Sequence, residues 1–414
     1  MDQQTGGIIS DNTSYSADFE SARPKWSQMP SAIQISAARQ ISFSGGTYTQ
    51  IGSGGIGVGN DANAHLTKVG LGTSEITIQD GYFTQVMGNS ITVGGIQANA
   101  HHPSEKGMVI SNITITGNIF FNTSSLFSST VPILATYLQY STISHNDLST
   151  TPYSGLCYGY GWGSNDAGGS PEYVNRGLYK YQPKYTTPTT LKNNLIEGNL
   201  IHNFGFSHTD LGGLYTLSKS PDTKIIDNYV YDSSYFGIYN DEGSNSLIQT
   251  GNLLFTRGSW YVANNQAGNK NTGNNTLSGN WAASASSPNI KAADVGQTGT
   301  DGLKRAYRAG ILPGKRTGRP VSNSAALKDA AVDITSSNGQ IIVKVTNFDD
   351  VAFTDVTFSM PASGLTASNV PTSIPANSAA SATYTYSGSK PAVSATVQYT
   401  NPRTGKTSTL NAKG

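Results

Sequence analysis

Short runs of alternating apolar and polar residues recur along the N-terminal part of the chain. Each run closes on a glycine or an asparagine, as in residues 41–46, 113–118 and 247–252. Apolar residues at every second position predict β-strands that bury one face. A repeat of roughly 25–35 residues predicts that each run belongs to one rung of a parallel β-solenoid. The closing residues are Gly46, Gly81, Asn118, Asn146, Asn199, Asn228 and Asn252.

The recurrent closing asparagine predicts a tight corner in every rung. Asparagine tolerates the left-handed backbone conformation that such a corner needs. When asparagines stack in successive rungs, their side-chain amides can also hydrogen-bond to one another as a ladder. We therefore expect the asparagines to form one column along the solenoid.

A second strand in each rung follows the same rhythm. Its inward-facing residues align as Ile56, Ile91, Ile133, Leu156, Leu214 and Ile238. Because side chains alternate, the residue three positions later should face outward. That outward column reads Gly59, Gly94, Thr136, Gly159, Leu217 and Asp241. Its glycines predict a shallow outer floor on which a ligand approaches the backbone, with an aspartate at the end.

Two segments interrupt the repeat. Residues 160–192 form a long insertion rich in glycine, tyrosine and proline, and long ordered loops on a rigid scaffold usually carry function. From about residue 325, alternating strands recur at the spacing of a β-sandwich. We therefore expect an all-β protein with a parallel β-helix domain at residues 1–285, a cap or linker at 286–324 and a β-sandwich at 325–414.

Composition narrows the classes of function. Charged residues make up 12% of the chain and the formal net charge is +1, which argues against a broad surface for nucleic acid. No apolar run reaches the length of a membrane span. The single cysteine, Cys157, excludes a disulfide within the chain, and we interpret it as a packing residue. We expect a monomer without a cofactor that acts outside the cell, although no signal peptide is visible.

Carboxylates are the first candidates for chemistry. Asp210 directly precedes one strand of the predicted floor, and Asp241 and Glu242 lie at the end of the floor strand in the next rung. Neighbouring rungs are about 4.8 Å apart, so these groups could flank one glycosidic bond, whose hydrolysis needs two carboxyl groups. The alternative is that they are turn carboxylates bonded to backbone amides, the commoner role of aspartate beside glycine.

Histidine and aromatic side chains near the same strands are candidates for sugar contact. The spacing of the six histidines fits no zinc motif, so we expect no metal site. Aromatic faces suit the apolar faces of sugar rings, and the alternative is that these rings belong to the core. The predicted substrate-binding residues are Asn60, Asp61, His101, His102, Tyr160, Trp162, Asp166, His208, Tyr215 and Tyr239.

A resemblance to a known family rests on three segments. Residues 153–169 read Tyr-Ser-Gly-Leu-Cys-Tyr-Gly-Tyr-Gly-Trp-Gly-Ser-Asn-Asp-Ala-Gly-Gly, and residues 214–218 and 237–244 read Leu-Tyr-Thr-Leu-Ser and Gly-Ile-Tyr-Asn-Asp-Glu-Gly-Ser. All three are similar to segments of right-handed β-helix proteins that degrade polysaccharides. Over roughly residues 30–285 the chain resembles glycoside hydrolase family 141, which includes α-L-fucosidase and xylanase activities.

The resemblance implies a right-handed β-helix and a glycoside hydrolase that uses acidic residues. Carried over by motif, the acidic pair would be Asp210 and Asp241, with Glu242 close by. The family's run usually reads Asp-Gly-Gly, whereas here Leu211 stands between Asp210 and Gly212. The C-terminal module resembles the immunoglobulin-like domains often appended to such enzymes.

Two other functions fit the same fold. A polysaccharide lyase would need a lysine or arginine base and often calcium. The aligned floor strands carry neither lysine nor arginine, which disfavours this reading. A glycan-binding or adhesin solenoid without catalysis is the other alternative.

Overall fold

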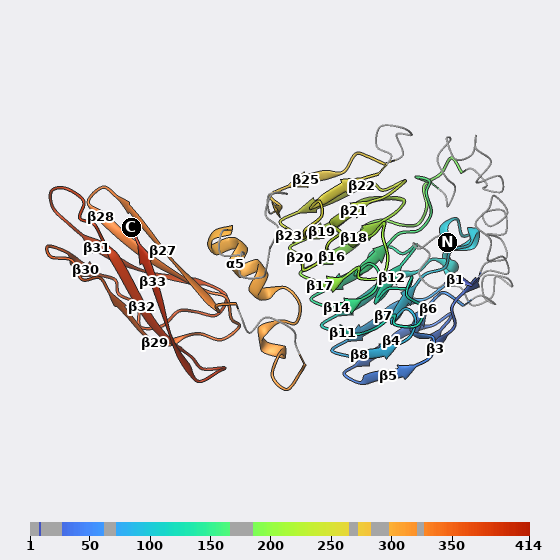
Figure 1. Ribbon diagram of the computed structural model, residues 1–414, viewed down its shortest axis with the longest axis horizontal. Coiled ribbons are helices and arrows are strands. Elements are labelled where there is room, and N and C mark those ends of the chain that lie inside the picture. Colours follow the sequence, from blue (N-terminus) through green and yellow to red (C-terminus); the bar gives the residue numbers. More distant parts are fainter. Residues whose placement is uncertain are drawn as a thin grey trace. The chain divides into compact units, whose positions relative to one another are not determined.

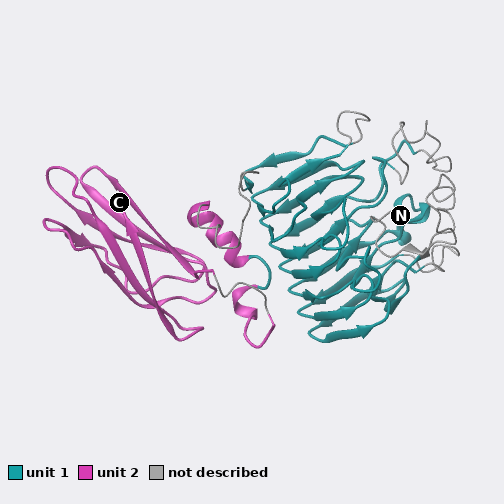
Figure 2. Ribbon diagram, in the orientation of Figure 1, with its two compact units in different colours: residues 1–292, 309–311 teal, residues 293–308, 312–414 magenta. Residues whose placement is uncertain are grey.

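The structure is a computed structural model that describes residues 8–9, 27–61, 72–165, 185–264, 272–282, 298–320 and 327–414. The chain divides into two compact units (Figure 2). Unit 1 comprises residues 1–292 and 309–311, and unit 2 comprises residues 293–308 and 312–414. No helix in the described ranges is long and apolar enough to cross a membrane.

Unit 1 is built from three parallel sheets of eight strands each (Figure 1). The chain visits the three sheets in turn, so each turn of the chain adds one strand to every sheet. This is a parallel β-solenoid, and the prediction of that architecture is confirmed.

The first sheet consists of β4 (Arg39–Ser44), β7 (Ser74–Gln79), β10 (Ser111–Thr116), β13 (Thr142–Ser144), β16 (Leu195–Glu197), β19 (Lys219–Ile226), β22 (Asn245–Thr250) and β25 (Thr276–Ser278). The second consists of β5 (Thr47–Ile51), β8 (Tyr82–Val86), β11 (Ile119–Phe121), β14 (Asp147–Thr151), β17 (Leu200–Phe204), β20 (Tyr229–Tyr231), β23 (Leu253–Phe255) and β26 (Trp281–Ala282). The third consists of β3 (Ser31–Ile35), β6 (Gly54–Val58), β9 (Ile91–Val93), β12 (Ile133–Ala135), β15 (Leu156–Tyr158), β18 (Gly212–Thr216), β21 (Phe236–Asn240) and β24 (Tyr261–Ala263). Outside these sheets lie the antiparallel pair β1 (Ile8–Ile9) and β2 (Ser27–Gln28), the helix α3 (Ala98–His101) and the 3-10 helix η3 (Lys106–Met108).

The inward column predicted for the third sheet is confirmed. Each of its residues pairs in register with the next, and all are at most 1% exposed. The column consists of Ile56, Ile91, Ile133, Leu156, Leu214 and Ile238. The alternation of apolar residues therefore located both the strands and their pairing.

The predicted asparagine ladder is also present, between the first and second sheets. Each side-chain amide donates to the Oδ1 atom of the asparagine in the next rung at 2.9–3.1 Å and to an interior carbonyl. The ladder reaches one rung beyond the prediction and consists of Asn118, Asn146, Asn199, Asn228, Asn252 and Asn280.

The left-handed corner residue is not the asparagine, as we had expected, but the residue before it. At these corners, among residues with a described backbone, the residue before the closing position has a positive φ angle, and at the first corner the closing Gly46 has one as well. The preceding residues are Gly45, Asp80, Gly117, His145, Gly198, Asp227, Gly251 and Gly279. Glycine and aspartate accept this conformation readily, and histidine does so more often than most residues. The asparagine after it is thereby free to turn its amide inward.

The predicted open floor is wrong, because all six residues of the outward column are buried. Gly59, Gly94 and Gly159 have positive φ angles and turn the chain at the strand ends. A Cβ atom at Gly159 would lie 1.9 Å from the carbonyl oxygen of Leu217, one rung away. These glycines allow rungs to pack closely, and they do not expose the backbone to a ligand.

Unit 2 contains two antiparallel sheets that share one apolar core. The four-stranded sheet has the order β27 (Ala330–Ser337), β28 (Gln340–Asn347), β31 (Ala379–Thr385), β30 (Thr366–Ser368). The three-stranded sheet has the order β29 (Thr354–Ser359), β32 (Ser394–Asn401), β33 (Lys406–Lys413). The helix α5 (Gly299–Arg308) and the 3-10 helix η5 (Pro313–Lys315) precede them in the chain.

Candidate active site

Asp210 and Asp241 lie at opposite ends of two adjacent strands of the third sheet. Asp210 precedes β18, and Asp241 follows β21. Tyr215 of β18 and Tyr239 of β21 pair in register, and their ring centroids are 4.8 Å apart. Because Leu214 and Ile238 point into the solenoid, alternation turns both tyrosines to its outer side.

The two tyrosines tie the two aspartates to each other's strands. The hydroxyl of Tyr215 donates to Oδ2 of Asp241 at 2.5 Å, and the hydroxyl of Tyr239 donates to Oδ1 of Asp210 at 2.6 Å. Each carboxyl group is thus oriented by a residue of the neighbouring rung. The burial of both rings, at 1% and 3% exposed, fixes the two donors in place.

Asp241 is enclosed at 2% exposed. The side-chain amide of Asn264 donates to its Oδ1 atom at 2.7 Å, so both carboxyl oxygens have a partner. Burial raises the pKa of Asp241, the hydrogen bonds from Tyr215 and Asn264 lower it in part, and the charge of Asp210 raises it again. The net result is a pKa above the usual range, so this carboxyl group keeps its proton to a higher pH than an ordinary aspartate.

Asp210 is exposed and has a φ angle of 59°, in the left-handed region. The hydroxyl of Tyr153 donates to its carbonyl oxygen at 3.1 Å. The intervening Leu211 is fully buried, and a Cβ atom at Gly205 would come within 2.7 Å of its side chain. Leu211 therefore anchors the loop that holds Asp210 at the surface.

Gly212 provides the space for Tyr239. A Cβ atom at Gly212 would lie 2.8 Å from the Cβ atom of Tyr239, closer than two such atoms can approach. The glycine after Leu211 is therefore needed for the position of the tyrosine that holds Asp210.

Glu242 is 1% exposed and directly follows Asp241. The chain turns at Gly243, with a φ angle of 80°, and a Cβ atom there would lie 2.6 Å from the carbonyl oxygen of Gly163. The start of the long insertion therefore packs on the turn that carries Glu242. Trp162 and Tyr160, whose rings are 6.0 Å apart, belong to this same segment.

His101 and His102 join the same segment through aromatic contacts. Tyr137 lies 5.2 Å from the ring of His101, and its hydroxyl donates to the carbonyl oxygen of Tyr160 at 2.5 Å. The ring of His102 stacks on Tyr185 at 3.8 Å, and its Nε2 atom donates to the carbonyl of Thr187. With Nε2 as the donor, Nδ1 of a neutral His102 accepts from Nδ1 of His101 at 2.6 Å.

His208 lies two residues before Asp210 and pairs with Ser128 through Nε2 at 2.8 Å. Its ring also meets the edge of Tyr153 at 5.9 Å. Burial lowers the pKa of His208, so the neutral form predominates at neutral pH.

Two predicted substrate-binding residues, Asn60 and Asp61, are not brought to the aspartates. Asn60, which accepts from Gln34 at 2.7 Å, and Asp61 follow β6. Four strand spacings, about 19 Å, separate β6 from β18. Asp166 lies outside the residues that the structure describes.

Sequence reasoning missed Asn264. It occupies the position after β24 that Asp241 occupies after β21, because Ala263 pairs with Asn240. Extending the strand alignment by one rung would have found it. In the described part of the chain, no group of three histidine, cysteine, aspartate or glutamate residues could hold a metal ion.

Comparisons with known proteins add little. No protein-family model matches the chain, and no curated protein matches it. A solved structure described as "Glycoside hydrolase" is similar to 69% of the chain at 21% sequence identity, with a TM-score of 0.48. The matched part is 41% of that protein, so the chain spans less than half of its length. A match this distant does not identify the activity of the chain.

Proposed function

We propose that unit 1 is a glycoside hydrolase in which Asp210 and Asp241 are the paired carboxyl groups. The observation that carries this proposal is a pair of hydrogen bonds between neighbouring rungs. Tyr215 donates to Asp241, and Tyr239 donates to Asp210. Hydrolysis of a glycosidic bond needs one carboxyl group that holds a proton and one that does not. A pair of carboxyl groups in contrasting surroundings, one enclosed and one exposed, suits that division.

In this proposal Asp241 is the general acid. Its raised pKa supports the role, because the group must be protonated when it meets the glycosidic oxygen. After it gives up the proton, the donors of Tyr215 and Asn264 stabilise the carboxylate that remains. Asp210 acts as the second carboxylate, and either activates water or attacks the anomeric carbon.

The residues around the pair have supporting roles. Tyr239 and Leu211 position Asp210, whereas His208 is proposed to contact the sugar. Tyr160 and Trp162 are not included, because their side chains are 0% and 5% exposed and belong to the apolar core of unit 1. The eight strands of the third sheet contain no lysine or arginine, which favours hydrolysis over a lyase reaction.

We further propose a right-handed solenoid that acts as a monomer on an extracellular polysaccharide or oligosaccharide. Right-handed crossovers are the rule between parallel strands. We propose that the sandwich of unit 2 is immunoglobulin-like. Its strands, lettered A to G in chain order, form sheets A-B-E-D and C-F-G, which is the immunoglobulin arrangement.

The test is a screen of the chain against plant and microbial glycans with mass analysis of the products. On a glycan that is cleaved, Asp210→Asn and Asp241→Asn should each reduce the rate at least about 100-fold. Asp222→Asn, an exposed aspartate on β19, is the matched control and should keep full activity. Circular dichroism should show all three variants folded. Near-normal activity in both active-site variants would contradict the proposal.

A further inference from the structure

Unit 2 contains a cavity of about 580 Å³ outside the site described above. Residues of η5, of the segment before β27 and of β32, β33 and their connection line it. Its volume is within the range of small-molecule sites, about 300–1,000 Å³. Four basic side chains line it, Arg316, Lys328, Arg403 and Lys406, against two acidic ones, Asp329 and Asp349.

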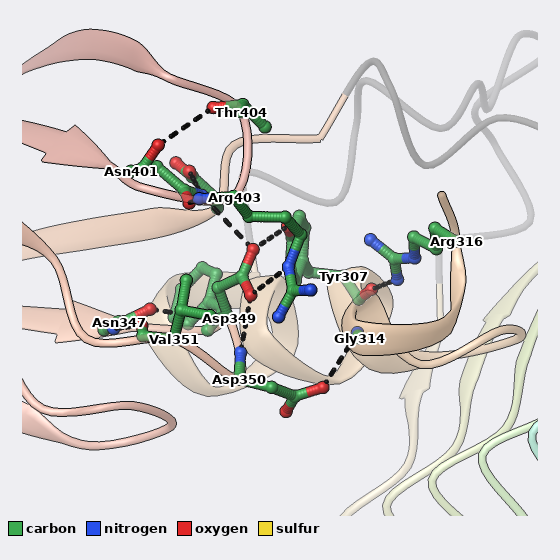
Figure 3. A network of polar contacts seen from close by, with 12 residues as sticks. Tyr307, Gly314, Arg316, Asn347, Asp349, Asp350, Val351, Asn401, Arg403 and Thr404 are labelled. Atoms are coloured by element: carbon green, nitrogen blue, oxygen red, sulfur yellow. Dashed lines mark hydrogen bonds and ion pairs between the residues drawn. The ribbon is translucent and has the colours of Figure 1, made fainter. Parts of the chain in front are cut away.

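Both acidic side chains already accept hydrogen bonds from protein groups, and Asp349 is paired with Arg403 (Figure 3). Asp349 is fully buried and accepts from Nε of Arg403 at 2.8 Å, from the hydroxyl of Tyr307 at 3.1 Å and from Asn401 at 3.2 Å. Asp329 accepts from Asn401 at 2.7 Å and from the hydroxyl of Tyr399. Both carboxylates therefore have hydrogen-bond donors within the protein, and the four basic side chains of the lining outnumber the two acidic ones.

Arg403 is fixed by one hydrogen bond to Asp349 and has further donors available. Only its Nε atom bonds to Asp349, and its two terminal nitrogens have no hydrogen-bond partner among the residues described. The side chain is 20% exposed, so these two donors are accessible from the cavity. A guanidinium with two free parallel donors matches the two oxygens of a carboxylate or sulfate.

The other basic groups reinforce this donor pair. The guanidinium of Arg316 lies 4.6 Å from the centre of the Tyr307 ring and donates to the carbonyl oxygen of the same residue (Figure 3). Lys328 and Lys406 are exposed, and within the described ranges neither forms an ion pair. Two rigid guanidinium groups and two mobile ammonium groups thus line one cavity.

We propose that this cavity binds the oxyanion of an acidic sugar, either a uronate carboxylate or a sulfate ester. The anion site is argued from the cavity alone, whereas the assignment of the anion to a sugar rests on the function proposed for unit 1. The terminal nitrogens of Arg403 form the bidentate contact, and Lys406 and Lys328 attract the anion at the rim.

The test is isothermal titration calorimetry with the full chain carrying Asp210→Asn, which removes turnover without touching the cavity. The probes are a uronic-acid trisaccharide, a sulfated trisaccharide, a neutral trisaccharide and inorganic sulfate. We expect at least one acidic trisaccharide to bind, more weakly as salt rises, and the neutral one not to bind. The two acidic probes distinguish a carboxylate from a sulfate ester.

Three variants locate the binding. Arg403→Lys keeps a charge beside Asp349 but loses the paired donors, and should weaken binding about tenfold or more. Lys406→Gln should weaken it about threefold. Lys390→Gln, which removes the same charge from an exposed loop away from the cavity, should change nothing.

Three results would overturn the proposal. One is equal affinity for the acidic and neutral trisaccharides, and another is unchanged affinity in both Arg403→Lys and Lys406→Gln. The third is binding of inorganic sulfate without binding of either acidic trisaccharide, which would reject the sugar. Because binding is measured without turnover, loss of the proposed hydrolase activity would leave all three results interpretable.

Discussion

Both units bury amides and carboxyl groups, but their most extensive buried polar networks are built differently. Unit 1 buries neutral amides, which repeat along one direction so that each asparagine satisfies the next. Unit 2 buries charge, with Asp349 fully enclosed and paired to Arg403 and Tyr307. A repeat can satisfy one type of polar group with copies of itself, whereas a sandwich with a single core needs a specific set of unlike partners.

Asp349→Ala should have the largest effect on stability. It leaves Arg403 and Tyr307 without their partner, and breaking a buried pair costs about 3–5 kcal/mol. Hydrogen exchange of β27 to β33 should report the loss. Fluorescence of the four tryptophans, all of them in unit 1, should be unaffected.

The control is Asp301→Ala, which removes a surface partner of Arg305 that is 65% exposed. Surface pairs contribute about 1 kcal/mol or less. Equal losses in the two variants would show that burial of the Asp349 carboxylate does not increase its contribution to stability.

Asn199→Ala should have the next largest effect, about 2–3 kcal/mol in unit 1. It removes the acceptor of Asn146 and the donor to the carbonyl of Ile143, both in the interior. Tryptophan fluorescence during urea unfolding measures the change. Asn280→Ala, at the last rung and only half-buried, should lose clearly less, and equal losses would argue against a ladder of connected bonds.

Gly212→Ala should destabilise unit 1 by about 1–2 kcal/mol, because its Cβ atom would overlap Tyr239. If Tyr239 positions Asp210 for catalysis, hydrolysis should fall more than stability predicts. Gly52→Ala is the control, since a Cβ atom there meets nothing within 4 Å. If the loss of hydrolysis is no larger than the unfolded fraction of the Gly212→Ala variant, Tyr239 does not position Asp210 for catalysis.

The smallest predicted effect is a pair of opposite pH dependences. At Asp349, burial alone would raise the pKa, but Arg403 and Asn401 outweigh it and hold the pKa below the usual range. Its contribution to stability is present above about pH 4, the unfolded value, and is lost as pH falls through the folded value. Asp241 has a raised pKa, so its contribution is present below about pH 4 and is lost as pH rises through the folded value.

Urea unfolding between pH 3 and pH 8 checks both signs. Relative to the unmodified chain, Asp349→Asn should lose more stability at pH 7 than at pH 3. Asp241→Asn should gain stability relative to the unmodified chain as pH rises from 3 to 7. The reason is that burial penalises the ionised carboxylate of Asp241, whereas an asparagine amide does not ionise. Slopes of the same sign would contradict the contrast between the two units.

Much of the solenoid could be predicted because its information is local and repeated. Alternation identified Ile56, Ile91 and Ile133 as one buried column, and the recurrent asparagine identified the ladder. The prediction of an open floor was wrong because alternation along one strand does not show what the neighbouring rung covers. A position that points away from the core of one rung can still be enclosed by the neighbouring rung, as Gly159 is by Leu217.

The sequence by itself therefore determined the period, the strand faces, the pairing register and the two candidate aspartates of unit 1. Only the tertiary structure decided that Tyr215 and Tyr239 donate hydrogen bonds to those aspartates, and that Arg403 keeps two donors free beside a buried Asp349. Periodicity specifies which face a residue occupies. Hydrogen bonds, burial and pKa depend on side chains that are distant in sequence, and only the folded chain brings them together.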